Sequence, residues 1–228
     1  RTLLVRRFES SQYAFKISLE NMLQNCLNIK NWVEKRHKVP IYKKGMLPDI
    51  SSLYESTDDT MDEIISETAE MAIESLKSKG MFELDADYLN DDFMKDLDSD
   101  IAILSELKEQ WSIIPDAKDP KLNEFVKIIK AQLQKDSTRK IVVFSQFADT
   151  VEYLGRRLEE ENLPVFAYTS ERASEKNKEY IKANFDAGYP AHKQVDVYKV
   201  LVATDAISEG YNLHRAGTIF NYDIPYNP

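Results

Sequence analysis

Residues 140–154 read KIVVFSQFADTVEYL. The run from Lys140 to Ser145 is short, apolar and rich in β-branched residues, which is typical of a strand buried on both faces of a sheet. The period then changes, and Asp149–Glu161 has the pattern of a helix. The apolar residues on one side of this helix are Val151, Leu154 and Leu158. A buried strand followed by an amphipathic helix indicates the first half of a βαβ unit.

The same alternation continues along the rest of the chain. We expect further strands at Val165–Tyr168, Val200–Thr204 and Thr218–Tyr222, and a further helix at Ser174–Asp186. Strands that alternate with helices of about a dozen residues indicate parallel pairing. The sequence therefore predicts an α/β fold over residues 119–228, with a parallel sheet and flanking helices.

Polar residues follow each predicted strand. The carboxyl ends of parallel strands lie at one edge of the sheet, and ligands bind beyond that edge. The residues that we expect along it are Ser145, Gln146, Thr169, Ser170, Thr204, Asp205 and Asp223.

The first half of the chain has a helical period instead. We expect helices over Glu9–His37, from Asp58 or Asp59 to Lys79, and over Asp87–Trp111. Pro115 and Pro120 indicate a linker after them. The sequence thus predicts two parts, an all-helical region of residues 1–118 and an α/β domain of residues 119–228.

Charge is unevenly distributed over the helical region. Residues 1–54 carry 10 Lys and Arg against 4 Asp and Glu, whereas residues 55–100 carry 3 against 16. The net charge of −9 therefore comes from one acidic stretch and does not exclude nucleic acid as a partner. The basic cluster consists of Lys35, Arg36, Lys38, Lys43 and Lys44. It could bind phosphates or pair with the acidic stretch, and we favour pairing.

Composition excludes several classes of protein. Six glycines and eight prolines are too few turn residues for an all-β barrel. The single cysteine, Cys26, excludes an intrachain disulfide and a cysteine-rich zinc site, and it fits a reducing, cytoplasmic location. The histidines His37, His192 and His214 have no metal-ligand spacing, so we expect no metal site. No apolar run is long enough to cross a bilayer, and we expect no membrane partner.

Two phosphate-binding motifs are also absent. The sequence has no G-x-x-x-x-G-K-[ST], the phosphate cradle of many ATPases, and no G-x-G-x-x-G of dinucleotide-binding domains. The sequence therefore offers no phosphate cradle of the usual ATPase kind, and a dinucleotide-binding domain is disfavoured.

Residues with binding chemistry gather in 200–228, VLVATDAISEGYNLHRAGTIFNYDIPYNP. Thr204 offers a hydroxyl at a strand end, which can bind a phosphate oxygen. Gly210 permits a positive φ or a close approach of a ligand to the backbone. Asn212 offers an amide for a ribose hydroxyl. Each residue alone is explained equally well as a cap, a turn or a local backbone partner, but together they indicate a binding site.

This segment resembles motif V of superfamily 2 helicases and translocases, followed by that family's next strand. KIVVFSQFADTVEYL (140–154) resembles motif IV of the Snf-like branch, and ERASEKNKEYIKANFD (171–186) resembles the helix between the two motifs. LLVRRFESSQYAF (3–15) is similar to the stretch that precedes the second lobe in bacterial Snf-like proteins. Ser-Glu-Gly at 208–210 and Tyr226 differ from eukaryotic remodellers and favour the bacterial side of the family.

The resemblance implies the second RecA-like lobe of an ATP-driven nucleic-acid motor, a truncated P-loop NTPase-type lobe that ends before the arginine-bearing motif VI. It implies nucleic-acid backbone contacts, with double-stranded DNA as the expected partner, at Ser145, Gln146, Thr169, Ser170 and Thr204. It also implies that Glu209, Gly210 and Asn212 face the nucleotide cleft. ATP and Mg²⁺ would bind only in the intact parent, together with the missing first lobe, so the fragment alone would be inactive.

Two other functions remain open from the sequence. The acidic helices could make the protein a non-catalytic scaffold for a protein partner. The strand-end residues could instead belong to an unrelated α/β enzyme that acts on a nucleotide sugar, without stimulation by nucleic acid.

Overall fold

The computed structural model describes residues 2–42, 70–71, 73–78, 80–204, 207 and 211–224. Among these residues, no helix offers a stretch long and apolar enough to cross a membrane. The chain divides into two compact units, of which the first joins Arg1–Ser18 to Ile114–Pro228 and the second is Leu19–Ile113. The first is called the α/β unit below, and the second the insertion unit.

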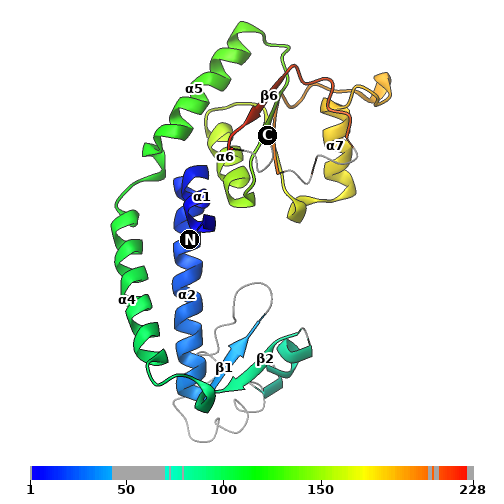
Figure 1. Cartoon of the computed structure of the whole chain (residues 1–228). Helices are drawn as coiled ribbons and strands as arrows, with labels where there is room; N and C mark the ends of the chain where they lie inside the picture. Colours follow the sequence, from blue (N-terminus) through cyan, green and yellow to red (C-terminus); the bar gives the residue numbers. More distant parts are fainter. Residues whose placement is uncertain are drawn as a thin grey trace, which may run out of the picture. The chain divides into compact units, whose positions relative to one another are not determined.

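The α/β unit contains a parallel sheet of four short strands (Figure 1). The strands are β3 (Ile141–Phe144), β4 (Val165–Tyr168), β5 (Val200–Ala203) and β6 (Thr218–Asn221). Their order across the sheet is β4-β5-β3-β6, and every neighbouring pair is parallel. The predicted α/β class and all four predicted strands are therefore confirmed.

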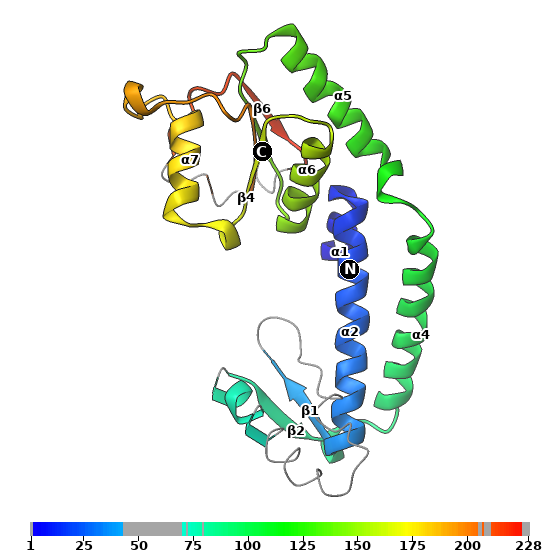
Figure 2. The ribbon, with the colours of Figure 1, turned by 180° about the vertical axis from the view of Figure 1, so that it is seen from behind.

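Helices cover both faces of the sheet (Figures 1 and 2). They are α5 (Pro120–Lys135), α6 (Ala148–Glu160) and α7 (Glu175–Phe185), with 3-10 turns η3 (Asp116–Lys118), η4 (Ser170–Arg172) and η5 (Ala191–Lys193). Residues of β3 alternate between the two cores. Ile141 and Val143 pack with α5 and α6, whereas Val142 packs with α7. Burial on both faces is the reason for the apolar run in the sequence.

Helix α5 is absent from the sequence-based prediction, which took Pro115 and Pro120 as marks of a linker. Pro120 stands instead in the first turn of α5, where its missing N–H costs nothing. Asp119 caps the helix, because its Oδ1 accepts the N–H of Leu122 at 3.1 Å. The buried face of α5 is Leu122, Phe125, Val126 and Ile129, at helical spacing.

The start of the chain packs in the α/β unit. It forms α1 (Thr2–Ser10) and the first turns of α2 (Gln12–Arg36). The ring of Tyr13 stacks on Tyr153 of α6, with centroids 5.0 Å apart. Arg7 forms an ion pair with Asp149, also on α6. The structure therefore groups the first 18 residues with the α/β unit, whereas we expected them within a helical region of residues 1–118.

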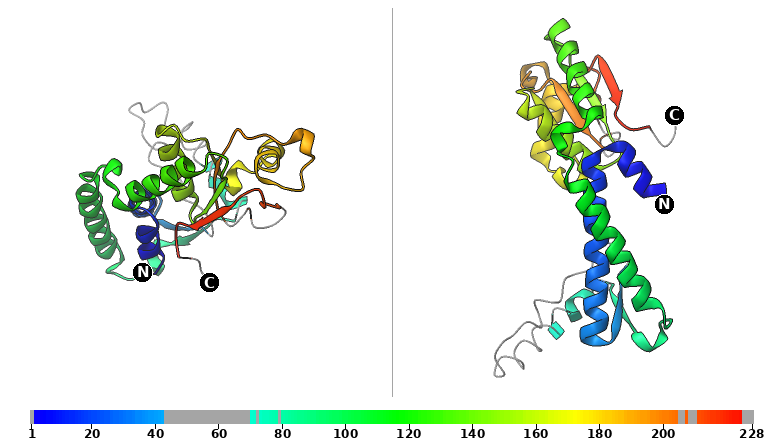
Figure 3. Two further views of the ribbon diagram at one scale, coloured as in Figure 1. Left: turned by 90° about the horizontal axis from the view of Figure 1, so that it is seen from above. Right: turned by 90° about the vertical axis from the view of Figure 1, so that its left-hand side faces the viewer.

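The insertion unit is not all-helical, and this part of the prediction is wrong. Besides α2 and α4 (Phe93–Ser112), it contains an antiparallel pair, β1 (Lys38–Ile41) and β2 (Phe82–Asp85), followed by η2 (Ala86–Tyr88). Figure 3 shows α2 and α4 side by side, and the ion pairs Lys30–Asp98 and Lys108–Glu20 join them. Residues 70–71 and 73–78 are helical, and the expected start of that helix at Asp58 or Asp59 lies outside the described residues.

Basic residues of the insertion unit pair with its acidic stretch, as favoured above. Arg36 pairs with Glu70 at 2.5 Å and with Glu83 at 3.0 Å. Lys77 reaches the other oxygen of Glu83 at 3.2 Å. The carboxylate of Glu83 is buried, so these two cations offset its desolvation. The phosphate-binding alternative for Arg36 loses its support, while Lys43 and Lys44 lie outside the described residues.

Candidate functional site

The carboxyl ends of the four strands form one polar edge of the sheet. The register pairs Phe144 with Ala203 and with Asn221, and Tyr168 with Ala203. The next residue of each strand is therefore level with its neighbours. Backbone hydrogen bonds continue there, from Ser145 N to Ala203 O at 3.1 Å and from Thr204 N to Tyr168 O at 3.3 Å. The structure thus brings Ser145, Gln146, Thr169, Ser170, Thr204 and Asp223 to one edge, as their positions in the sequence predict.

These residues differ in their access to solvent. Ser145 is 2% exposed and Thr169 is 1% exposed. Ser170 is exposed, and Gln146 and Thr204 are half-buried. Only the last three could meet a ligand without a rearrangement of the edge.

Asp223 holds the turn between β3 and α6. Its Oδ2 accepts the hydroxyl of Ser145 at 2.6 Å and the backbone N–H of Gln146 at 2.8 Å. The side chain of Gln146 reaches past it, and its Nε2 donates to the carbonyl of Ile224 at 3.1 Å. The end of β6 and the start of α6 are therefore joined by three hydrogen bonds. The sequence places Asp223 at this edge but does not reveal that it binds Ser145.

Lys121 of α5 lies on the other side of the Asp223 carboxylate. Its Nζ donates to the carbonyls of Glu9 at 2.8 Å and Ser10 at 3.0 Å, and it lies 3.7 Å from Asp223 Oδ1. It also lies 4.1 Å from the centroid of the Tyr222 ring, a cation–π distance. Burial lowers the pKa of Lys121 below its usual value, while the charges of Asp223 and Asp119 act in the opposite direction. Burial likewise raises the pKa of Tyr222.

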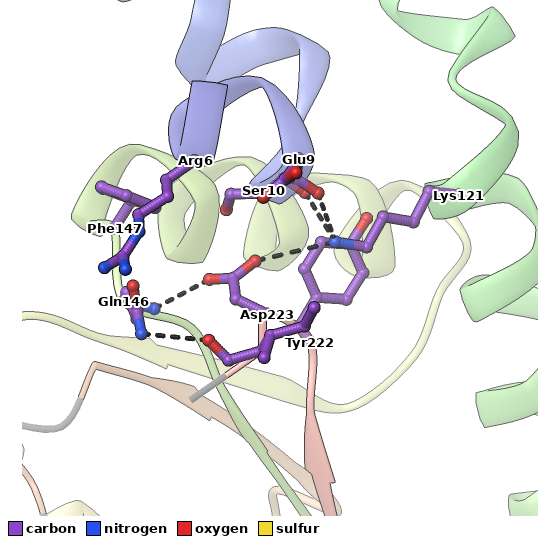
Figure 4. A pocket seen from close by; sticks show the side chains of 9 residues that line it. Arg6, Glu9, Ser10, Lys121, Gln146, Phe147, Tyr222 and Asp223 are labelled. Carbon is purple, nitrogen blue, oxygen red and sulfur yellow. Dashed lines mark hydrogen bonds and ion pairs between the residues drawn. The ribbon is translucent and has the colours of Figure 1, made fainter. Parts of the chain in front are cut away.

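A cavity of about 600 Å³ opens beside this group. Figure 4 shows Arg6, Phe147 and Gln146 at one end of it, Lys121 and Tyr222 at the other, and Asp223 between them. Its lining is completed by Glu9, Ser10 and Ile224. The cavity thus carries charges of both signs between two aromatic rings.

Sequence reasoning missed Lys121 because it assigned no helix to residues 120–135. The signal was present in the apolar spacing that follows Pro120, together with the capping residue Asp119. A helix predicted from these two signals would have placed Lys121 in its first turn, but it would not have shown that Lys121 lies beside Asp223.

The residues expected at the nucleotide are not brought together in the described part of the chain. Glu209 and Gly210 lie outside the described residues. Asn212 is exposed, and its carbonyl accepts the N–H of Ala187 at 3.2 Å, just beyond the end of α7. That end of α7 lies near the start of β3, because the Lys140 Nζ is 5.1 Å from the ring of Phe185. The hydroxyl of the adjacent Tyr211 lies 3.4 Å from that of Tyr168, the last residue of β4.

One further cluster is brought together by the insertion unit. His37 Nε2 lies 2.8 Å from Asp87 Oδ1 and 4.0 Å from Asp85 Oδ1, and all three side chains are exposed. The hydrogen bond to Asp87 raises the pKa of His37, with the charges of Asp87 and Asp85 in support and desolvation opposed. No spacing along the chain predicts this cluster, because the pairing of β1 with β2 brings the residues together.

Comparison with known proteins finds a similarity to one domain family over residues 120–228. They match the model of the helicase conserved C-terminal domain. The expected resemblance to a helicase C-terminal lobe is confirmed at that level, while the Snf-like branch and the bacterial origin stay predictions. No curated protein matches the sequence.

Two solved structures are similar to part of the chain. One is the crystal structure of the Pyrococcus furiosus Hef helicase domain, with 22% identity and a TM-score of 0.38, covering 57% of this chain and 24% of that one. The other is Mss116p DEAD-box helicase domain 2 bound to an RNA duplex, with 19% identity and a TM-score of 0.37, covering 46% of this chain and 39% of that one. The match therefore spans well under half the length of either structure.

Proposed function

We propose that the α/β unit is the second lobe of an ATP-driven nucleic-acid translocase of the Snf-like branch of superfamily 2, acting on double-stranded DNA in the cytoplasm of a bacterium. The proposal rests above all on one observation: residues 120–228 match a helicase C-terminal domain and carry a row of hydroxyl and amide groups at one edge of a parallel sheet. A sheet edge of this kind is where α/β proteins bind their ligands.

The proposed contacts are with the backbone of the nucleic acid. Thr204 and Ser170 would donate their hydroxyls to phosphate oxygens, and Gln146 would donate its side-chain amide. Ser145 and Thr169 are buried, so we assign them to the support of this edge and not to direct contact. Contacts with phosphate and sugar carry no sequence information, which suits a motor that moves along any sequence.

ATP and Mg²⁺ belong to this proposal as ligands of the complete protein, together with its first lobe. We assign the nucleotide contacts to Glu209, Gly210 and Asn212, of which the described Asn212 is exposed. These three residues alone do not make a phosphate cradle. The sequence also contains no lysine-bearing phosphate loop. We therefore assign these 228 residues no step of hydrolysis and expect no ATPase activity from them alone.

The ATPase rate of the complete parent protein tests the motor. It would be measured alone and with duplex DNA, single-stranded DNA or RNA, for the wild type and for a Thr204→Ala, Gly210→Val variant. We expect stimulation by duplex DNA and its loss in the variant. Stimulation by RNA only would reject the DNA assignment. Absence of hydrolysis with every nucleic acid would reject the motor and favour the scaffold.

Direct binding by the 228-residue chain tests the edge separately. Fluorescence anisotropy of labelled duplex DNA should show weaker binding for Gln146→Ala and Thr204→Ala. Thr138→Ala is the matched control, because this exposed hydroxyl bonds only within its own turn, before the start of β3. Equal affinities for Thr204→Ala and Thr138→Ala would show that the polar edge is not the binding surface.

A further inference from the structure

We propose that Asp223 and Lys121 are positioning residues of this nucleic-acid edge: Asp223 fixes the Ser145–Gln146 turn, and Lys121 offsets the charge of that carboxylate. The inference rests on the proposed function, because it concerns the same edge. It adds two residues that do not themselves contact the nucleic acid, and it explains why a carboxylate can stand where phosphates are expected.

The first step concerns the geometry of the turn. Ser145 is buried, and its hydroxyl and the N–H of Gln146 share one acceptor, Asp223 Oδ2. The N-cap position of α6 is Phe147, which has no side-chain oxygen to cap the helix. Asp223, which follows β6, accepts instead from the two residues that precede this N-cap and so holds the approach to the helix. Without it, a buried hydroxyl and a backbone N–H at the start of α6 would lack their partner, and the side chain of Gln146 would lose its fixed position.

The second step concerns charge. A carboxylate next to the edge repels phosphate, and the repulsion falls only with the inverse of distance. Lys121 Nζ lies 3.7 Å from the carboxylate oxygen that Ser145 does not use. The potentials of the two opposite charges nearly cancel at any distance that is long compared with their separation, as for a bound phosphate. Asp223 can therefore act as an acceptor without repelling the ligand.

The third step concerns the placement of Lys121. Its ammonium group is held by the carbonyls of Glu9 and Ser10 and by the ring of Tyr222, so it does not depend on Asp223 for its position. Those two carbonyls end α1, where the helix dipole favours a cation. The packing of the N-terminal helix thus places a positive charge behind Asp223.

The test of charge compensation uses two glutamine variants of α5. Lys121→Gln removes the charge but can still donate to the carbonyls of Glu9 and Ser10. Lys127→Gln removes the same charge from a lysine that pairs with the exposed Glu124, further along α5 and away from the edge. We expect Lys121→Gln to bind labelled duplex DNA about fivefold more weakly than wild type at low salt, with little change for Lys127→Gln.

Salt and a second substitution separate charge from structural damage. The loss in Lys121→Gln should shrink at higher salt and should be largely restored in Lys121→Gln, Asp223→Asn, because the uncompensated carboxylate is then gone. Equal affinities of the two lysine variants, or a loss that neither salt nor the second substitution changes, would overturn the role of Lys121.

The test of positioning compares two variants with the same charge. Asp223→Asn keeps an acceptor oxygen for Ser145 and Gln146, whereas Asp223→Ala removes it. We expect Asp223→Ala to bind about fivefold more weakly than Asp223→Asn. Equal affinities would overturn the positioning role. If Asp223→Ala fails to fold, Ser145→Ala, which removes one donor to Asp223 and keeps its charge, is compared with wild type instead, and equal affinities would again overturn the positioning role. A wild type that binds no nucleic acid rejects the proposed function itself.

Discussion

The hydroxyls of Ser10 and Thr150 lie 2.7 Å apart, although 140 residues separate them in the chain. The hydroxyl of Ser11 lies 2.9 Å from the same Thr150 oxygen, and all three residues are buried. This contact joins the junction of α1 and α2 to the first turn of α6. It explains why the first residues of the chain belong to the α/β unit.

The first prediction concerns this hydroxyl cluster. Thr150→Val keeps the shape of the side chain but removes the hydroxyl that contacts both buried serines, while the Ser11 hydroxyl keeps the N–H of Ala14 as a partner. We expect the free energy of unfolding to fall by about 1–3 kcal/mol, measured by urea denaturation. Thr138→Val, at an exposed turn, serves as the control and should have little effect. Equal unfolding midpoints for the two variants would contradict the assignment.

The second prediction concerns the contact of α6 with the sheet. A Cβ on Gly155 would lie 2.6 Å from Cβ of Ala167 in β4, closer than such atoms approach. Gly155→Ala should therefore lower the free energy of unfolding by about 1–3 kcal/mol, as overpacking does. Gly217→Ala is the control, because a Cβ there meets no atom within 4 Å. Ala167→Gly in the Gly155→Ala background should recover part of the loss, and a further loss would argue against the clash.

The third prediction concerns the start of α5. Asp119→Ala removes the oxygen that accepts the N–H of Leu122, and we expect a loss of about 1 kcal/mol in unfolding free energy. Asp119→Asn retains a capping oxygen and should lose less. Thermal unfolding of the two variants provides the measurement. The same midpoint for both would mean that capping is not the contribution of Asp119.

The fourth prediction concerns the titration of His37. Its pKa is raised above the usual 6.5, first by the hydrogen bond to Asp87. A raised pKa in the folded state means that the stabilisation is fully present below pH 6.5 and is lost as the pH rises through the folded pKa. In an NMR titration, Asp87→Asn should lower the pKa of His37. Asp91→Asn, at an exposed acid outside this cluster, should leave it unchanged, and equal shifts would indicate only a general charge effect.

Local periodicity was enough to predict most of the α/β unit. Strands buried on both faces must be continuously apolar, and the helices between them must be apolar on one side, so β3 to β6 and α6 to α7 are visible in the sequence. Helix α5 was missed because a proline in its first turn was taken as a linker signal. Strands β1 and β2 were missed because each is only four residues long and is stabilised by a partner distant in the sequence.

The candidate site, like the fold, was predictable from the sequence only in part. Its location at the carboxyl edge follows from chain order, because parallel strands bring their ends together whatever their side chains are. Which hydroxyls would face a ligand does not follow, since Ser145 and Thr169 have the same polar character as Ser170 but are buried.

The sequence by itself therefore determined the α/β class, the order of its elements and the edge where polar residues gather, because these depend on periodicity and on chain direction. Tertiary structure alone decided that Asp223 accepts from Ser145 and that Lys121 stands behind it. Those contacts join α1, α5, β3 and β6, and hydrogen bonds and charges act over a few ångströms of space, irrespective of the distance along the chain.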